Sequence, residues 1–432
     1  MPYMKDTGSS ITPTAVRTDA VSGEYDDSLP DEISSSDHFL ESPKQTRGLN
    51  TWIELSYGNY RKNLSFLRRR VGADVELSAV VKADAYGHGL LQVATMAMAA
   101  GADSFCVHSL DEALNLRRAD FHEDILIMGH VPLARLSEVV RHGFRMVAYN
   151  IETLDALADL ESEAQDGPVR LHLKLETGTH RQGIDGEVLD AFLDRLRSIP
   201  WVSLEGVYTH FANIEDTTDH QYARGQLQRF QELLDVIEKA GFSPTKRHSA
   251  CSAAAILFPE THFDFVRVGI SQYGFWSSRE TLLSYELGAE NRDEAALSLR
   301  PVLTWKTRLS QVKWVQAGAS VGYGCSYKTT RRSRIGILPI GYSDGYDRGW
   351  SSASHVLVRG CRAPVCGRIC MNLVMVDLTD VPGAALEDEV VLIGSQGDWE
   401  VSADELAGLI GTIHYEVVAR LSRDIRRVIV AD

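Results

Sequence analysis

The first candidate for chemistry in this sequence is Lys82, in the stretch AVVKADAYGHG. It directly follows the apolar run Val75–Val81, which is typical of a buried strand. A lysine at the C-terminal end of a parallel strand lies at a barrel mouth, where active sites of such barrels are found. Burial among Val80, Val81 and Ala83 favours the neutral amine, the form that makes a Schiff base with an aldehyde. Position alone leaves open a lysine that simply emerges into solvent.

The chain must then supply elements that place Lys82 at such a mouth. Short apolar runs alternate with helical patterns about eight times, which predicts a parallel sheet. Eight units in this length fit a closed TIM-type (β/α)8 barrel. A doubly wound open sheet is the alternative, but no G-x-G-x-x-G follows the first strand. The expected strands are Val75–Val81, Ser104–His108, Ile125–Met128, Met146–Ala148, Val169–Leu175, Leu204–Thr209, Lys246–Ser249 and Phe265–Gly269.

The two ends of the chain differ from this middle part. Residues 1–47 are rich in Ser, Thr, Asp and Glu, which predicts a disordered acidic extension. We expect the barrel over 48–285, where a short run at Trp52–Leu55 precedes a helical pattern, and a mostly β domain over 286–432. One helix is expected there, at Ala403–Leu409. The expected strands of the β domain are Val302–Leu309, Ser310–Val315, Arg334–Pro339, Val356–Arg362, Leu373–Leu378 and Glu389–Ile393.

Composition excludes several classes of protein. The formal net charge of −15 argues against a nucleic-acid binder, which needs a basic face. No apolar run is long enough to span a bilayer, and the N-terminal residues lack the apolar core of a secretory signal. We therefore expect a cytoplasmic protein with no membrane partner. In that compartment its six cysteines should be free thiols. Cys361, Cys366 and Cys370 are clustered, but their spacing is unlike a zinc site, so no metal is expected.

A series of motifs resembles the alanine racemase family. The resemblance runs from about Gly48 to Arg427, in the family's order and at family-like separations. It implies a barrel that binds pyridoxal 5'-phosphate (PLP), a C-terminal β domain and a head-to-tail homodimer with shared active sites. The implied reaction interconverts L- and D-alanine, which supplies D-alanine for peptidoglycan. Besides AVVKADAYGHG, the motifs are HLKLETGTHRQGI, LEGVYTHFA, HSACSAA, VRVGISQYG, VGYGCSY, LPIGYSDGYDRG, GRICMNLVMVD and GTIHYE.

The resemblance implies four catalytic roles. Lys82 would hold PLP and act as the base on one face of the substrate Cα, and Tyr323 would act from the opposite face. Tyrosine titrates near pH 10, so its phenolate needs stabilisation, and His210 matches the histidine that hydrogen-bonds it. Arg267 matches the arginine facing the PLP ring nitrogen. A guanidinium only donates, so that nitrogen must be unprotonated, which makes the cofactor a weaker electron sink.

Further residues match contacts of the cofactor and the substrate. The PLP phosphate would meet Tyr86, the Ser252 hydroxyl and the backbone N–H groups of Gly269 and Ile270, and His248 would support Arg267. Lys174 would be carbamylated and pair with Arg181, which meets the substrate carboxylate; a plain Lys174–Glu176 surface pair is the alternative. Tyr342, Arg348 and Arg368 would line the substrate route. Met371 would contact the carboxylate through its backbone, and Tyr323, Tyr342 and Met371 would reach the other subunit's PLP.

Three positions depart from the family's pattern. Cys251 replaces an Asn before Ser252, and Val268 replaces a Pro after Arg267. More important, Arg423 stands where the family has a Tyr that contacts the phosphate and narrows the pocket. Arginine can bind phosphate through two parallel hydrogen bonds, but a wider pocket would admit serine or larger amino acids.

Three other functions remain open from the sequence. A racemase of broader specificity, for serine or a basic amino acid, would keep the same catalytic residues. A non-catalytic PLP-binding barrel would share the Lys82 motif but would have neither the β domain nor Tyr323. A PLP decarboxylase on a related barrel uses an acidic partner for the ring nitrogen, which Arg267 does not match.

Overall fold

The computed structural model describes residues 39–41, 43–161, 167–288 and 299–431. The chain divides into two compact units, Met1–His38 and Phe39–Asp432, and only the second contains described residues. Of the extension predicted over residues 1–47, residues 1–38 lie outside the described part. Later in that extension, the Phe39 ring packs 5.1 Å from that of Tyr57, and the Glu41 N–H donates to Ile429 O (2.7 Å).

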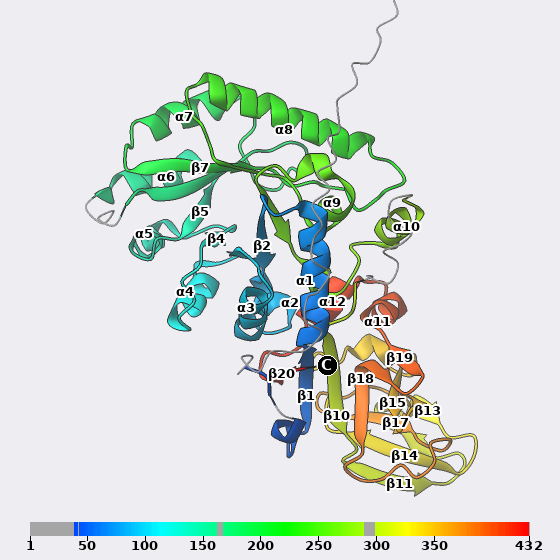
Figure 1. Cartoon of the computed structure of the whole chain (residues 1–432). Coiled ribbons are helices and arrows are strands. Elements are labelled where there is room, and N and C mark those ends of the chain that lie inside the picture. The colour runs from blue at the N-terminus through cyan, green and yellow to red at the C-terminus, as the bar shows by residue number, and fades with distance from the viewer. Residues whose placement is uncertain (1–38, 42, 162–166, 289–298, 432) are drawn as a thin grey trace, which may run out of the picture. The chain divides into compact units, whose positions relative to one another are not determined.

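Eight parallel strands form the predicted TIM-type barrel (Figure 1). Neighbours pair in chain order, and the first strand pairs with the last. The barrel is completed between β8 and β9, where Asp264 N donates to Arg247 O and Arg267 N to Ala250 O, both at 3.1 Å. The strands are β2 (Glu76–Val80), β3 (Ser104–Val107), β4 (Ile125–Ile127), β5 (Arg145–Ala148), β6 (Val169–Lys174), β7 (Val202–Tyr208), β8 (Lys246–His248) and β9 (Phe265–Val268).

Helices surround this barrel because each has one apolar face. In α7, for example, Leu189, Phe192, Leu193 and Leu196 recur at helical spacing and are all buried. The strands β3, β5 and β9 are buried along their whole length, as expected for a sheet covered on both faces. The helices are α1 (Tyr57–Val71), α2 (Lys82–Tyr86), α3 (Leu90–Ala99), α4 (Leu110–Arg118), α5 (Leu136–Arg141), α6 (Ile151–Ala158), α7 (Leu189–Arg197), α8 (Gln221–Lys239), α9 (Ser252–Leu257) and α10 (Arg279–Leu287).

The C-terminal part is mostly β, as predicted. Its helices are α11 (Ala403–Ile410), which was expected, and α12 (His414–Ala419), which was not. Its strands are β10 (Leu303–Arg308), β11 (Gln311–Val315), β12 (Ser320–Val321), β13 (Tyr327–Lys328), β14 (Ser333–Leu338), β15 (His355–Val358), β16 (Cys361–Pro364), β17 (Val374–Asp377), β18 (Glu389–Gln396), β19 (Trp399–Val401) and β20 (Arg426–Val430).

Two expectations need correction. The run Trp52–Leu55 opens no barrel unit: β1 (Thr51–Ser56) pairs antiparallel with β10 and parallel with β20, in the sheet of the C-terminal domain. The expected single strand Val356–Arg362 is a hairpin, because Arg359 and Gly360 have φ of 53° and 72° and turn the chain between β15 and β16. The boundaries at residues 48 and 286 stay a prediction, and β1 belongs with the second domain by its pairing.

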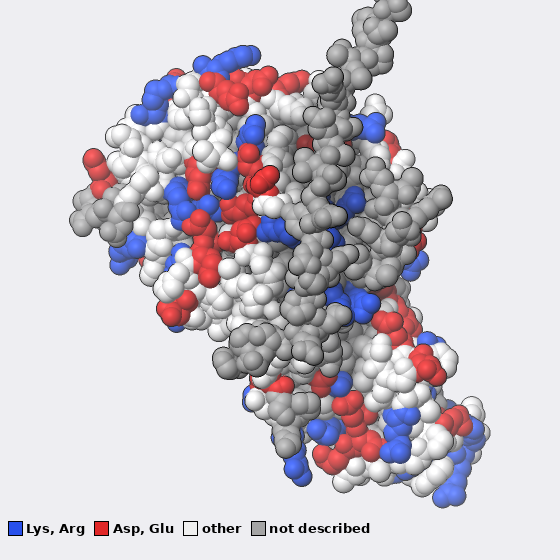
Figure 2. Space-filling view, in the orientation of Figure 1, with Lys and Arg blue, Asp and Glu red and all other residues white. Residues whose placement is uncertain are grey.

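The surface mixes both signs of charge. On the face shown in Figure 2, acidic and basic side chains gather together over the area where Figure 1 labels β2, β4 and β5. Among the described residues, no helix is long and apolar enough to cross a membrane, and no group of three His, Cys, Asp or Glu side chains is arranged to hold a metal. All six cysteines are free thiols.

Candidate active site

Lys82 lies at the C-terminal end of β2 and begins a turn of reversed hand. Ala83, Asp84 and Ala85 have φ of 55°, 55° and 52°, and Tyr86 continues at 55°. Each L-residue costs about 1–2 kcal/mol in this left-handed conformation, so the fold must hold it in place. Side chains do so at two points: the Ala83 N–H donates to Glu112 Oε1 (2.7 Å) and the Leu90 N–H to Asp84 Oδ1 (2.8 Å).

The electrostatics at Lys82 favour a reactive amine. Burial lowers the pKa of its ammonium group, and the charges of Arg181 and Arg267 lower it further. Its Nζ lies 5.9 Å from the centroid of the Tyr86 ring. Desolvation and two nearby guanidinium groups disfavour the charged form. A larger fraction of the Lys82 amine is therefore neutral and nucleophilic than at a surface lysine.

Arg267, on β9, is buried, and only some of its N–H groups have hydrogen-bond partners. Its Nη2 donates to Thr209 O (2.8 Å) and Ser249 O (3.0 Å). Its guanidinium lies 5.0 Å from the Tyr208 ring centroid. The Nε–H is buried and has no hydrogen-bond partner among the described residues. A buried donor without a partner is costly, so this N–H is available for an acceptor on a bound group.

The same arginine determines the form of His210. Its Nη1 lies 3.5 Å from His210 Nδ1, and because a guanidinium can only donate, Nδ1 must accept. Burial and the charge of Arg267 hold the pKa of His210 well below its ordinary value. His210 is therefore neutral, with its proton on Nε2, where it can donate to a third group.

The predicted phosphate contacts, called here the Ser252 cradle, lie at the start of α9 and of the 3-10 turn η5 (Ile270–Tyr273). Ser252 Oγ accepts from the N–H groups of Gly269 (3.0 Å) and Ser271 (3.4 Å). A Cβ at Gly269 would lie 2.7 Å from Tyr86 Oη, so glycine is what lets that hydroxyl approach. Ile270 is the first residue of the turn, where the turn offers its N–H no acceptor. Tyr86, Ser252 and Gly269, which were predicted to contact phosphate, therefore lie close together, with Ser271 beside them.

Lys174 lies at the end of β6 and is only 5% exposed. Burial, followed by the charges of Arg181 and Arg267, lowers its pKa to about 8. Its Nζ donates to Gln182 Oε1 (3.3 Å). The alternative of a Lys174–Glu176 pair is not formed, because the Glu176 carboxylate instead accepts from the N–H groups of Gly178 and Thr179, both at 2.6 Å.

Tyr323, Tyr342 and Met371 form a second group, on the C-terminal domain. They are 73%, 43% and 55% exposed. Tyr342 and Met371 are brought together by a pair of backbone bonds, from Tyr342 N to Cys370 O and from Ser343 N to Met371 O, both at 3.1 Å. Among the described residues, no hydrogen bond or ion pair joins this group to the group around Lys82.

Comparison with known proteins identifies a family for both the barrel and the C-terminal domain. The family model of the alanine racemase N-terminal domain matches residues 55–276, and that of the C-terminal domain matches 302–429. The chain belongs to the alanine racemase family. The alanine racemase of Leptospira interrogans is 37% identical over 383 residues, which cover 88% of this chain and 96% of that protein. That of Symbiobacterium thermophilum is 40% identical over 377 residues, covering 87% and 96%.

Solved structures of alanine racemases have the same fold. The enzyme of Streptomyces coelicolor A3(2) superposes with a TM-score of 0.81 at 34% identity and covers 89% of this chain and 99% of its own. The enzyme of Bacillus anthracis with bound L-Ala-P gives 0.80 at 33% identity, covering 88% and 95%. Relatives this similar over most of the chain support alanine racemase function here.

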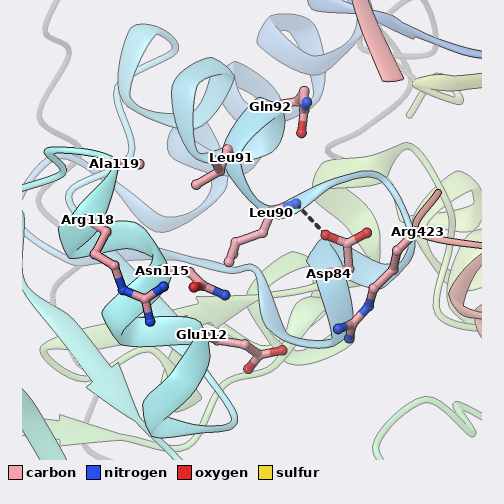
Figure 3. A pocket seen from close by; sticks show the side chains of 9 residues that line it. All are labelled: Asp84, Leu90, Leu91, Gln92, Glu112, Asn115, Arg118, Ala119 and Arg423. Atoms are coloured by element: carbon pink, nitrogen blue, oxygen red, sulfur yellow. Dashed lines mark hydrogen bonds between the residues drawn. The ribbon is translucent and has the colours of Figure 1, made fainter. Parts of the chain in front are cut away.

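Against the alanine racemase pattern, Arg423 takes an unexpected place. It lines a pocket of about 510 Å³ beside the left-handed turn rather than the Ser252 cradle. Figure 3 shows it next to Asp84, with Arg118 across the pocket. An aromatic ring near the cradle comes instead from α12, where Tyr415 lies 6.2 Å from the Tyr86 ring. Sequence reasoning missed Tyr415, although it stands inside the motif GTIHYE.

The other expected residues are placed as follows. His248 is fully buried, and its ring makes no hydrogen bond to Arg267; both instead contact the ring of Tyr208. Arg348 begins the 3-10 turn η9 (Arg348–Trp350). Arg368 lies against Gly324, next to Tyr323. Cys251 and Val268 keep their neighbours in position, since Cys251 precedes α9 and Val268 ends β9.

Proposed function

We propose that this chain interconverts L- and D-alanine, with PLP held on Lys82 in a homodimer whose active sites are shared. The observation that carries this proposal is the unpartnered Nε–H of buried Arg267, whose charge helps to lower the pKa of the Lys82 amine. That donor fits the unprotonated ring nitrogen of PLP. The Ser252, Gly269 and Tyr86 cradle fits its phosphate. When bound, PLP supplies an aldehyde for Lys82 and withdraws electrons from the substrate Cα.

Racemisation needs a proton to leave one face of Cα and another to arrive on the opposite face. In the barrel, Lys82 Nζ is the group that can take and return a proton on its own face. His210 is neutral and donates through Nε2, so it does not serve as the opposing base. Tyr323 has a suitable hydroxyl but is 73% exposed on the other domain. A second copy of the chain would bring its Tyr323 to this barrel, where the Nε2–H of His210 stabilises the phenolate.

The substrate carboxylate would be held by Arg181 and by the Met371 backbone of the second copy. Lys174 contributes by carbamylation, which joins its Nζ to the carbon of CO2 and releases one proton. That reaction needs the neutral amine, and a pKa lowered to about 8 makes it available near neutral pH. The product is an anion that orients Arg181. We place the enzyme in the cytoplasm, where it would supply D-alanine for peptidoglycan.

The test is exchange of the α-hydrogen in D2O. PLP-loaded protein is incubated separately with L-alanine, L-serine and L-lysine, and deuterium uptake and optical rotation are followed. The proposal expects L-alanine to racemise fastest. Faster racemisation of serine or lysine would replace alanine as the substrate and would fit a pocket widened at Arg423. If PLP binds to Lys82 but no substrate exchanges, the chain is a cofactor-binding protein and the proposal is wrong.

A further inference from the structure

A line of buried polar side chains extends from Arg267 through the barrel interior, and the proposed mechanism gives most of them no role. His172 on β6 and His248 on β8 are both fully buried. His172 Nε2 lies 3.1 Å from Glu205 Oε2, and His172 Nδ1 lies 2.8 Å from His248 Nε2. The His248 ring then stacks on Tyr208, at 4.7 Å and nearly parallel. The line thus ends at the aromatic ring that Arg267 also contacts.

The direction of each hydrogen bond in this line follows from Glu205, the residue with which the line starts. The Glu205 carboxylate can only accept, so His172 Nε2 carries a proton. Burial lowers the pKa of both histidines, so both are neutral. A neutral His172 has a bare Nδ1, and His248 must donate to it from Nε2. The remaining nitrogen, His248 Nδ1, is left with a lone pair and no proton.

The surroundings of His248 Nδ1 agree with this assignment. The atom is buried and has no hydrogen-bond partner among the described residues. Tyr208 lies on one side of the ring and Phe265 at 4.6 Å on another, and the face of neither ring can accept a conventional hydrogen bond from it. The guanidinium of Arg267 is near the same Tyr208 ring. A nearby cation favours a lone pair over a second N–H dipole at this position.

Arg145, a second partner of the Glu205 carboxylate besides His172, helps to keep this carboxylate ionised. Arg145 donates to Glu205 Oε1 through Nη2 (3.2 Å), and it also forms ion pairs with Glu76 (2.7 Å) and Asp124 (2.8 Å). Burial opposes ionisation, but the hydrogen bond from His172 and the charge of Arg145 lower the pKa of Glu205 to about 2. The carboxylate that starts the line is therefore ionised at neutral pH and accepts from His172.

We propose that Glu205 and His172 are positioning residues that fix the tautomer of His248, so that Nδ1 of this ring, which stacks on the Tyr208 side chain that Arg267 also contacts, carries no proton. Neither residue touches substrate or cofactor in this scheme. The tautomer itself is a property of the folded barrel. Only its catalytic consequence, a correctly placed Arg267, rests on the proposed function.

The experiment reads the ring nitrogens directly, by ¹⁵N NMR of histidine-labelled, PLP-loaded protein. Signals are assigned by their absence in His172→Asn and His248→Asn. In the wild type, both rings should be protonated at Nε2 alone. In Glu205→Gln, the new amide can donate to His172, which reverses each bond and moves the proton of His248 to Nδ1. We expect kcat/KM for alanine to fall about 10-fold, the lower end for an outer partner that orients a functional histidine.

Asp124→Asn is the matched control. It removes a carboxylate from the same Arg145 but has no contact with His172, so both tautomers and the activity should stay as in the wild type. Protonation of His248 at Nδ1 in the wild type would overturn the proposal, as would equal effects of the two substitutions. If Glu205→Gln does not fold, the wild-type tautomers still decide. Wild-type protein with the expected tautomers but no racemisation would refute the proposed function and leave this inference standing.

Discussion

The group around Lys82 and the group around Tyr323 differ in nearly every physical respect. In the barrel, Arg267 and Lys174 are each 5% exposed, and burial together with the charges of Arg181 and Arg267 lowers the pKa of Lys174. On the C-terminal domain, Tyr323 and Met371 are more than half exposed, on short turns between strands. The barrel group holds its geometry alone. The side chains of the second group are largely exposed to solvent, as expected for a surface that another subunit completes.

The largest effect is expected at Lys82. Lys82→Ala removes both the attachment point and a base, so kcat should fall roughly 10⁴-fold. The absorbance of bound PLP after gel filtration checks attachment separately from turnover. The control is Lys62→Ala, which removes an exposed lysine on α1. Retention of covalent cofactor by Lys82→Ala would show that another amine is the attachment point.

Tyr323→Phe should cost roughly 10²- to 10³-fold in kcat, because it removes one of two acid/base groups. The rate of α-hydrogen exchange in D2O should fall by different factors for L-alanine and for D-alanine, because Tyr323 acts on one face of Cα. Tyr327→Phe, four residues further along, serves as the control. Equal losses of α-hydrogen exchange for L-alanine and D-alanine would argue against Tyr323 as the base for one face.

Mixing the two inactive variants tests whether the two groups come from different chains. If sites are shared, a hybrid dimer of Lys82→Ala and Tyr323→Phe chains has one intact site. Random exchange of subunits makes half of the dimers hybrid, so activity should recover to about a quarter of the wild type. The measurement is racemase activity after co-refolding an equal mixture. No recovery would place both groups in a site made by one chain.

A smaller effect is expected at the cradle. Gly269→Ala puts a Cβ 2.7 Å from the Tyr86 hydroxyl, so that hydroxyl must move away. Loss of one phosphate contact, about 1 kcal/mol, should weaken PLP binding about fivefold, measured by titration of the apoprotein. Gly225→Ala, where a Cβ meets nothing within 4 Å, should leave PLP binding unchanged. Unchanged binding in both variants would exclude Gly269 from the cradle.

The smallest effect concerns stability rather than activity. The pKa of Glu205 is lowered to about 2 from 4.5, so its contribution is present above pH 4.5 and is lost as pH falls towards 2. The wild-type Tm should decrease over that window, and the decrease should be shallower in Glu205→Gln. The control is Glu187→Gln, at an exposed site. A Glu205→Gln curve parallel to the wild type would contradict this account.

Much of this molecule was predictable from its sequence, for identifiable reasons. Most of the barrel strands contain short apolar runs that alternate with helical patterns, and their bounds were found to within a residue or two. The strand β1 was misplaced because its partners, β10 and β20, lie far along the chain. The hairpin at Arg359–Gly360 was missed because only a two-residue turn separates its two short arms.

The candidate site, like the fold, was predictable in part. Residue types in motifs identified Lys82, Arg267 and the Ser252 cradle. They did not predict that His248 faces His172 instead of Arg267, because that contact depends on side-chain direction inside the barrel. Nor could residue counting show that Arg423 turns into the pocket with Asp84 while Tyr415 approaches Tyr86.

The reversed hand of the Ala83–Tyr86 turn has a consequence for assembly. Four L-residues in this conformation cost about 4–8 kcal/mol together, so an isolated segment adopts another shape. The turn is kept by Glu112 and by close packing of Gly87 against the Val418 carbonyl of α12, near the opposite end of the chain. The position of the reactive amine therefore depends on packing against a helix from the far end of the sequence. Substitutions in α12 that loosen this contact should lower the reactivity of Lys82 towards an aldehyde without touching the site itself.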